Sequence, residues 1–165
     1  MSWRCNSNTR RVRPSDAADE KDGMDPTQSE VSALLDSQAD AMRTKDIDRL
    51  ISLYSPDVAY FDTVPPLQYA GSAALRERFL RWFDGWEGLF EMEIRDVHIL
   101  ASGDLAVAYR FSRVRGTRKD GQKAESWVRA TSCCQRSNHR WLITHEHVSW
   151  PVDVKSGRAA MDLMP

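Results

Sequence analysis

The sequence has no excess of charge of either sign and no long apolar segment. Its 23 Lys and Arg and 24 Asp and Glu residues nearly cancel, so no basic excess favours binding to nucleic acid or an anionic membrane. No apolar run is long enough for a transmembrane helix, and the first residues lack the apolar segment of a secretory signal. We therefore expect a soluble, cytoplasmic protein that binds neither nucleic acid nor membranes.

Cysteine and the common catalytic motifs are also scarce. There are three cysteines: Cys5 lies in a polar stretch, and the neighbours Cys133 and Cys134 would leave a strand on opposite faces. We expect three free thiols and neither a disulfide framework nor a zinc site. The chain contains no nucleophile elbow, phosphate-binding loop or dinucleotide fingerprint, and we expect no cofactor.

The 165 residues suit one domain with a tail at each end. Residues 1–26 are polar and charged with little to bury, and we expect them to be disordered. Their arginines could form an organellar targeting segment, but the acidic half and the missing apolar face argue against it, and Met24 is an alternative start to Met1. The expected domain spans residues 27–152, and residues 153–165 form a short C-terminal tail.

Apolar spacing predicts three helices and then a series of strands. The helices are expected from Thr27 to about Met42, after Asp46 through Tyr54 with Pro56 ending it, and from Ala73 to about Trp86. The expected strands are 58–62, 90–100 with a bulge near Arg95–Asp96, 105–111, 125–135 and 141–149. This order predicts an α+β fold in which a strongly bent antiparallel sheet wraps around the helices.

The last two strands carry polar residues where a structural strand would have valine or isoleucine. Alternation places large apolar and polar side chains together on core-facing surfaces: Trp127, Arg129 and Thr131 on one, and Trp141, Ile143, His145 and His147 on the other. Glu146 would then point the other way, to solvent or to an interface. Buried polar groups need partners, so these strands are the clearest functional signal.

Several interpretations of these residues are open. A buried Arg129 needs an anion, either an internal carboxylate such as Asp62 or an anionic ligand group. Asp62, at a strand end, could be a turn residue or, if it points inward, a proton carrier. The His-x-His pair could bind a metal with Asp62 or Glu125 as the third ligand, could be structural, or could hydrogen-bond a substrate; we favour a site without metal.

The order of elements resembles the ketosteroid isomerase-like, SnoaL-like branch of the nuclear transport factor 2 superfamily over about residues 29–152. The matching segments are Asp46-Ile-Asp, Leu53-Tyr54, Val58–Asp62, Gly71, Trp127–Thr131 and His145–Ser149 followed by Pro151. The resemblance implies a cone-shaped, cystatin-like sheet and, commonly, a homodimer.

The resemblance also implies roles for single residues. Asp62 falls at the position of the general base that moves a proton next to a carbonyl, and Tyr54 at that of a tyrosine supporting the oxyanion hole. Gln38 stands where the family has an oxyanion-binding tyrosine, and Arg129–Thr131 replace the protonated aspartate. These departures argue against transferring steroid isomerisation.

The sequence thus predicts a small-molecule-binding protein with an apolar pocket inside the cone. Asp62 would be the base of an isomerase, cyclase or dehydratase acting on an aromatic or polycyclic, perhaps anionic, substrate; Arg129 and His145 would polarise a carbonyl and His147 would orient them. The other expected pocket residues are Gln38, Tyr54, Tyr60, Trp82, Phe83, Tyr109, Trp127, Thr131 and Ile143. The alternative is a non-catalytic association module that dimerises through an outer sheet face carrying Val128, Ala130 and Ser132.

Overall fold

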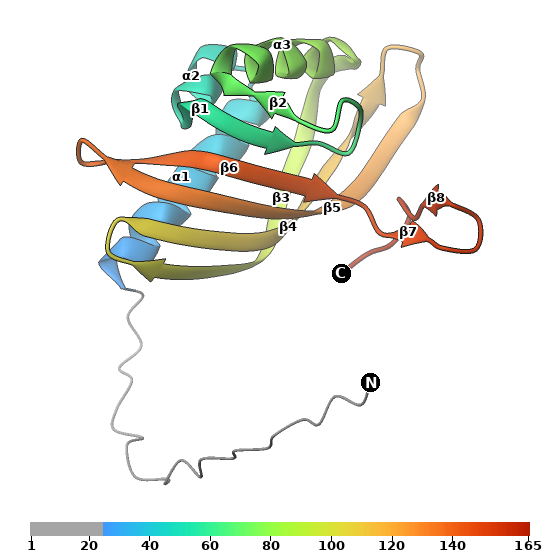
Figure 1. The fold of residues 1–165 in the computed structure, drawn as a ribbon. Helices are drawn as coiled ribbons and strands as arrows, with labels where there is room; N and C mark the ends of the chain where they lie inside the picture. The colour runs from blue at the N-terminus through green and yellow to red at the C-terminus, as the bar shows by residue number, and fades with distance from the viewer. Residues whose placement is uncertain (1–24) are drawn as a thin grey trace, which may run out of the picture.

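Three helices and a six-stranded sheet form the body of the computed structural model, which describes residues 25–165 (Figure 1). The helices are α1 (Pro26–Arg43), α2 (Ile47–Ser52) and α3 (Gly71–Asp84). The strands of the sheet are β1 (Tyr54–Phe61), β2 (Tyr69–Ala70), β3 (Trp86–Ser102), β4 (Leu105–Arg118), β5 (Lys123–Ser137) and β6 (Arg140–Ser149). Their order is β2-β1-β6-β5-β4-β3, with β1 and β6 parallel and the other neighbours antiparallel. The predicted α+β fold with a curved sheet is confirmed.

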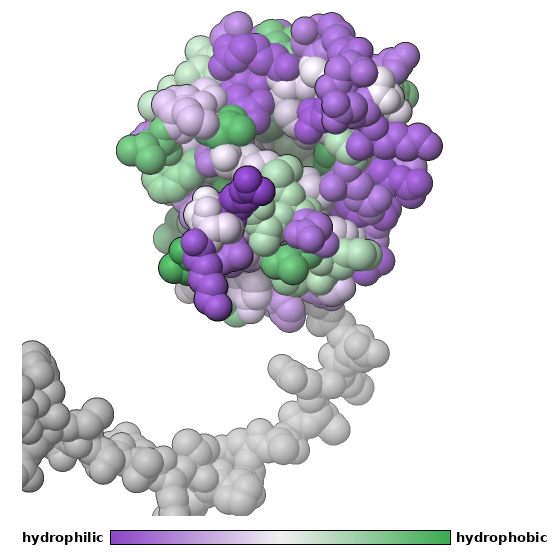
Figure 2. Space-filling view, turned by 90° about the vertical axis from the view of Figure 1, so that its right-hand side faces the viewer, coloured by the Kyte–Doolittle hydropathy of each residue, from purple (hydrophilic) through white to green (hydrophobic). Residues whose placement is uncertain are grey.

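The predictions for the N-terminal tail cannot be compared with the structure. Cys5, Met24 and nearly all of the expected tail of residues 1–26 lie outside the described residues. At the other end, the expected tail of residues 153–165 contains β8 (Arg158–Ala159), which pairs with β7 (Val152–Asp153). Seen from the side of this hairpin, the surface mixes hydrophilic and hydrophobic residues around a hollow (Figure 2). Among residues 25–165, no helix is both long and apolar enough to span a bilayer.

The helix boundaries follow from capping and from the sheet. The Asp25 side chain accepts a hydrogen bond from Thr27 N (3.4 Å), and Pro26 occupies the first turn of α1, where its missing N–H costs nothing. The prediction that Pro56 ends the second helix is wrong, because α2 ends at Ser52 and Tyr54 already belongs to β1. Pro56 is tolerated there because the register of β1 with β6 is irregular between Tyr54 and Ala59.

Two β-bulges decide which side chains face the helices. The predicted bulge in β3 is confirmed, since the register with β4 shifts between Arg95 and His98. A second bulge, not predicted, lies in β6, where Cys134 pairs with Ile143 but Cys133 pairs with His145. Thr144 is the extra residue, and it reverses the alternation of every residue after it.

The core lies between the inner face of the sheet and the helices. α1 packs against β3, and α3 packs against β1 and covers that end of the sheet (Figure 1). The aromatic wall predicted for the third helix is largely core: Phe79 and Phe83 are buried, and Trp82 lies with its ring centroid 4.8 Å from that of Phe90. The helices do not fill the whole inner face, and the space that remains is the candidate site.

Candidate ligand-binding site

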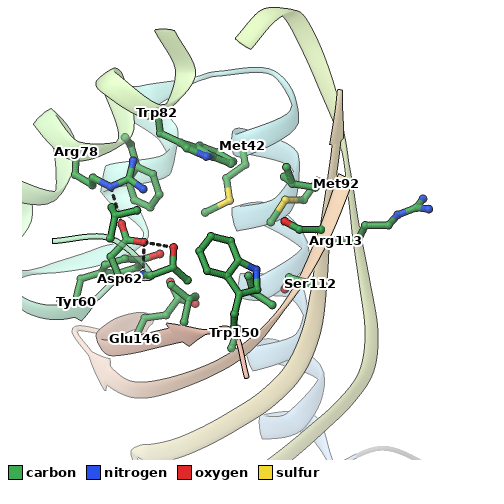
Figure 3. A pocket seen from close by; sticks show the side chains of 18 of the residues that line it. Met42, Tyr60, Asp62, Arg78, Trp82, Met92, Ser112, Arg113, Glu146 and Trp150 are labelled. Atoms are coloured by element: carbon green, nitrogen blue, oxygen red, sulfur yellow. Dashed lines mark hydrogen bonds and ion pairs between the residues drawn. The ribbon is translucent and has the colours of Figure 1, made fainter. Parts of the chain in front are cut away.

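A cavity of about 270 Å³ lies between α1, α3 and the inner face of the sheet (Figure 3). This volume is close to the lower end of the roughly 300–1,000 Å³ usual for small-molecule pockets. Apolar walls come from Met42, Trp82, Met92 and Trp150, whereas Tyr60, Asp62 and Glu146 gather on one side (Figure 3). The combination of a few polar groups with aromatic and thioether walls suits a small, largely apolar ligand.

Asp62 lies at this cavity because it follows β1 directly and continues the inward alternation of Val58 and Tyr60. The Asp62 side chain is 5% exposed, and its Oδ2 lies 2.6 Å from Nε of Arg78, which α3 contributes. Its Oδ1 accepts hydrogen bonds from Thr63 N (2.6 Å) and Thr63 Oγ1 (3.1 Å). Asp62 is therefore both a residue that stabilises the turn and a carboxylate at the cavity wall.

A buried ion pair forms the floor of the cavity. Glu146 Oε1 accepts hydrogen bonds from Arg110 Nη2 and Ser132 Oγ (both 2.8 Å), and its Oε2 accepts from Gln38 Nε2 (2.8 Å) and the Tyr54 hydroxyl (2.6 Å). Arg110 also donates to Ser132 Oγ (2.8 Å) and Gln38 Oε1 (2.7 Å). Buried charges are tolerated when they are paired and hydrogen-bonded in this way. The carboxylate of Glu146 is thus held by four donors.

Three buried groups beside this ion pair, Tyr54, Tyr60 and Cys134, have raised pKa values. Burial, followed by the negative charge of Glu146, raises the pKa of Tyr54 and that of Tyr60 well above the usual value. Burial also raises the pKa of the Cys134 thiol to about 12, with Glu146 as the next cause. Both hydroxyls are consequently hydrogen-bond donors at neutral pH, and the Cys134 thiol is a poor nucleophile.

Some of the predicted pocket residues lie at the cavity. Gln38, Tyr60, Asp62 and Trp82 line it. Tyr54 lies behind the wall and reaches the site through its hydrogen bond to Glu146. Phe83 and Ile143 are buried in the core and do not line the cavity.

The predicted orientation of the remaining site residues is wrong. Arg129 is exposed, Tyr109 is 46% exposed, and Thr131, which pairs with both Tyr109 and His147, lies on the same outer face. Trp127 is buried, but beneath the guanidinium groups of Arg95 and Arg113 on that outer face (5.1 and 5.7 Å from the ring centroid) rather than in the core. The cavity is lined instead by their neighbours in β5, among them Val128 and Ala130, which had been expected on the outside, and Ser132 is buried with them.

The two histidines also lie away from the cavity, because the bulge at Thr144 turns them outward and turns Glu146 inward. Nδ1 of His145 lies 2.7 Å from the carbonyl oxygen of Ala59, and the Phe61 ring packs against both His145 and His147. Within residues 25–165 no three His, Cys, Asp or Glu side chains are grouped to hold a metal ion. The metal hypothesis, with Asp62 or Glu125 as the third ligand, therefore finds no support in the geometry.

Several residues of the site escaped the prediction, among them the charged residues Arg78, Arg110, Arg118 and Glu146. Arg110 was missed because it stands between Tyr109 and Phe111, and Arg78 because it belongs to the charged run 76–78, which is typical of an exposed helix face. Arg118 lies beyond the expected strand 105–111, and Glu146 was missed because a bulge leaves little trace in the sequence. One signal was available: in β4 the residues Leu105, Val107 and Tyr109 alternate with Ala106, Ala108 and Arg110. Only one of these two sets can face the helices, and it is the smaller, more polar set.

Comparison with known proteins agrees with this architecture. The SnoaL-like domain family matches residues 31–153. The chain belongs to this family. An NTF2-like protein of unknown function from Pseudomonas putida KT2440 is 30% identical, with a TM-score of 0.78 over 87% of this chain and 100% of that one. No protein with a curated function matches the sequence.

Two further structures show the breadth of the fold. A Xanthomonas campestris protein, named provisionally as a calcium/calmodulin-dependent protein kinase II association domain, is 26% identical with a TM-score of 0.69, over 87% of this chain and 99% of that one. A ketosteroid isomerase-like protein from Erwinia carotovora atroseptica is 21% identical with a TM-score of 0.64, over 76% of this chain and 97% of that one. Similarity at the latter level shows the fold alone, so function must be argued from the site.

Proposed function

We propose that this SnoaL-like protein binds a small, largely apolar carbonyl compound in the cavity and moves a proton next to the carbonyl group without a cofactor. The observation that carries this proposal is Asp62: a carboxylate with a side chain only 5% exposed, at the wall of a cavity lined by aromatic and thioether groups. A carboxylate in such a place can accept a proton from a bound carbon acid. The reaction would be an isomerisation, a cyclisation or a dehydration.

Tyr60 is the group best suited to assist. It lies two residues before Asp62 on the same face of the chain and lines the cavity, and its hydroxyl makes no side-chain hydrogen bond within residues 25–165. A tyrosine hydroxyl is protonated at neutral pH, and burial raises the pKa of Tyr60 further, so the hydroxyl can donate to a developing oxyanion. Arg78 would position Asp62 through their 2.6 Å contact. Arg129 and His145, on the outer face, have no part in this mechanism.

The size of the cavity restricts the ligand. About 270 Å³ suits a molecule of one or two rings better than a four-ring steroid. The aromatic substrate expected from the sequence therefore remains part of the proposal, and a large polycyclic one does not. The cytoplasmic location remains a prediction.

Exchange of carbon-bound protons tests the mechanism without knowledge of the natural substrate. The methyl protons of 2-acetonaphthone, next to its carbonyl, will exchange with deuterated water faster in the presence of the protein, as followed by NMR. Asp62→Asn will lower the protein-dependent rate by about 10²- to 10⁴-fold, the usual contribution of a general base. Binding, read from the fluorescence of Trp82 and Trp150, will persist.

Asp57→Asn is the matched control, because Asp57 is an exposed aspartate of the same strand. This variant should exchange protons like the unmodified protein. Equal exchange rates in Asp62→Asn and Asp57→Asn would exclude Asp62 as the base. Binding of the ketone without exchange in any variant would leave a ligand-binding protein rather than an enzyme.

A second candidate function, self-association as a dimeric module, is favoured by the outer face of the sheet. One part of this face, beside the β3–β4 turn, is apolar: Leu100, Leu105, Val107 and Tyr109 are between 38% and 66% exposed. Exposed apolar patches of this kind mark contact sites. The proposed contact uses these residues, not Val128, Ala130 and Ser132. It is compatible with ligand binding, because the cavity opens on the other side of the sheet, and sedimentation equilibrium would detect it.

A further inference from the structure

The cavity is lined by more cationic than anionic side chains. Its arginines are Arg78, Arg110, Arg113 and Arg118, and its acids are Asp62 and Glu146. Arg110 is neutralised by Glu146 (2.8 Å) and Arg78 by Asp62 (2.6 Å). Arg113 points away from the cavity (Figure 3) and pairs with Glu93 (2.7 Å) and Glu125 (3.1 Å). Arg118 remains without an acidic partner within 4.0 Å among residues 25–165.

The position of Arg118 in β4 explains why it reaches the cavity. It lies in the even-numbered register of Ala106, Ala108, Arg110 and Ser112, all of which are buried on the inner face. Its backbone is held by hydrogen bonds with Gln122 O and Gly121 N, both 2.8 Å. Its guanidinium carbon stacks 3.7 Å from the centroid of the Trp86 ring. Stacking occupies one face of the guanidinium and leaves the N–H groups at its edge available for a planar anion.

The electrostatic surroundings of Arg118 are unfavourable for an unpaired cation. Burial lowers the pKa of its guanidinium; Asp120 opposes this change, and the nearby positive charge of Arg78 adds to it. Arg78 is thus close enough to influence both Asp62 and Arg118. An anion between the two arginines would relieve their repulsion and replace the water that Arg118 has lost.

We propose that the ligand of this cavity carries a carboxylate, which Arg118 binds with support from the charge of Arg78, while the ligand's apolar body lies against Trp82, Met42 and Met92. This carboxylate anchor rests on the proposed function, because both assume that one ligand occupies this cavity. A single guanidinium without an acidic partner, in a cavity whose other charges are paired, suits a monoanionic carboxylate better than a dianionic phosphate. Because Arg78 is already paired with Asp62, the carboxylate binds Arg118, and the carbon that loses its proton is a different part of the ligand, next to Asp62. The substrate class is therefore a small apolar keto acid.

Two probes that share one ring system separate this inference from the proposed function. 2-Naphthoate carries a carboxylate, and 2-acetonaphthone carries a neutral carbonyl group on the same naphthalene. At low ionic strength the protein will bind 2-naphthoate about ten- to a hundredfold more tightly than 2-acetonaphthone, as expected for hydrogen bonds to a charged group. Quenching of tryptophan fluorescence measures both affinities, since Trp82 and Trp150 line the cavity.

Arg118→Gln will remove this preference, with 2-naphthoate binding weakened at least tenfold and 2-acetonaphthone binding changed less than twofold. Arg118→Lys, which retains the charge but not the planar fork, will fall between the two. The matched control is Arg115→Gln, because the Arg115 side chain is 57% exposed on the same strand and does not line the cavity. Retained binding of the neutral probe shows that each variant is folded.

The outcomes distinguish the two proposals. If the protein binds 2-acetonaphthone as tightly as 2-naphthoate, or if Arg118→Gln and Arg115→Gln have equal effects on 2-naphthoate, the carboxylate anchor is wrong and the proposed function stands. If neither probe binds, both are wrong. If the preference for 2-naphthoate is lost in Arg118→Gln but kept in Arg115→Gln, the carboxylate anchor is supported, whatever the rate of proton exchange.

Discussion

Glu146→Gln tests whether the buried ion pair is the structural floor of the cavity. The substitution keeps the shape of the side chain but leaves the Arg110 guanidinium, 4% exposed, without a counter-charge. It also places an amide where four donors converge on a carboxylate. Removing one partner of a buried ion pair typically costs about 3–5 kcal/mol. Since domains are stable by only about 5–15 kcal/mol, this loss is a large share of the total.

Urea unfolding followed by circular dichroism measures the effect. With a slope of about 1–3 kcal/mol per molar urea, the midpoint will fall by at least about 1 M. The matched control is Glu91→Gln, whose carboxylate is 63% exposed and lies 3.7 Å from Arg113; it should cost less than about 1 kcal/mol. Adding Arg110→Met to Glu146→Gln will recover part of the loss, because the unpaired charge is removed.

Two results would refute this reasoning. One is a Glu146→Gln variant within about 1 kcal/mol of the unmodified protein, which would mean that the pair is solvated or open in solution. The other is a double variant that loses as much as the sum of the single variants, which would mean that the two residues act independently.

Two further predictions concern alkaline stability and assembly. The pKa values of Tyr54 and Tyr60 are raised in the folded protein, so above about pH 10 the unfolded chain loses protons that the folded chain keeps. The free energy of unfolding will therefore fall as the pH rises from there. Tyr54→Phe will make this fall shallower in urea titrations between pH 9 and 11. Val107→Arg will shift the protein toward monomer in sedimentation equilibrium without lowering its thermal midpoint. The control Leu67→Arg, in a loop and 97% exposed, will leave the oligomeric state unchanged. If the unmodified protein is monomeric at high concentration, the proposed contact is wrong.

Most of the fold could be predicted from the sequence because its signals are local. Helical spacing from Thr27 to Met42, caps such as Asp46 and the broken alternation at Arg95–Asp96 each report on a few neighbouring residues. The errors at Tyr54 and Pro56 arose where a long-range contact decided the outcome. The hydrogen bond from Ile143 N to Leu53 O (2.9 Å) ties this segment to β6 and makes it a strand.

The site could be predicted only in part because its geometry depends on which face of each strand is inside. Asp62, Tyr60 and Gln38 were found, since β1 and α1 follow the simple periodicities. In β5 the large apolar side chain of Trp127 suggested that its face of the strand points to the core. Instead, the side chains of Arg95 and Arg113 cover the indole on the outer face of the sheet. In β6 a single extra residue exchanged the roles of His145 and Glu146.

The bulge at Thr144 determines which side chains of β6 form the floor of the cavity. Without it, the inward positions of β6 would continue from Ile143 to His145 and His147, and the floor would be two histidines. With it, the floor is Glu146, whose carboxylate is already satisfied by Arg110, Gln38, Tyr54 and Ser132 and has little capacity left for a ligand. The groups that we propose act on a ligand line the walls: Asp62 and Tyr60 at the end of β1, and Arg118 at the end of β4. In the proposed mechanism the floor residues stabilise the fold and the wall residues act on the ligand, so we expect variants of Glu146 or Arg110 to lower stability and variants of Asp62 or Arg118 to change exchange or binding instead.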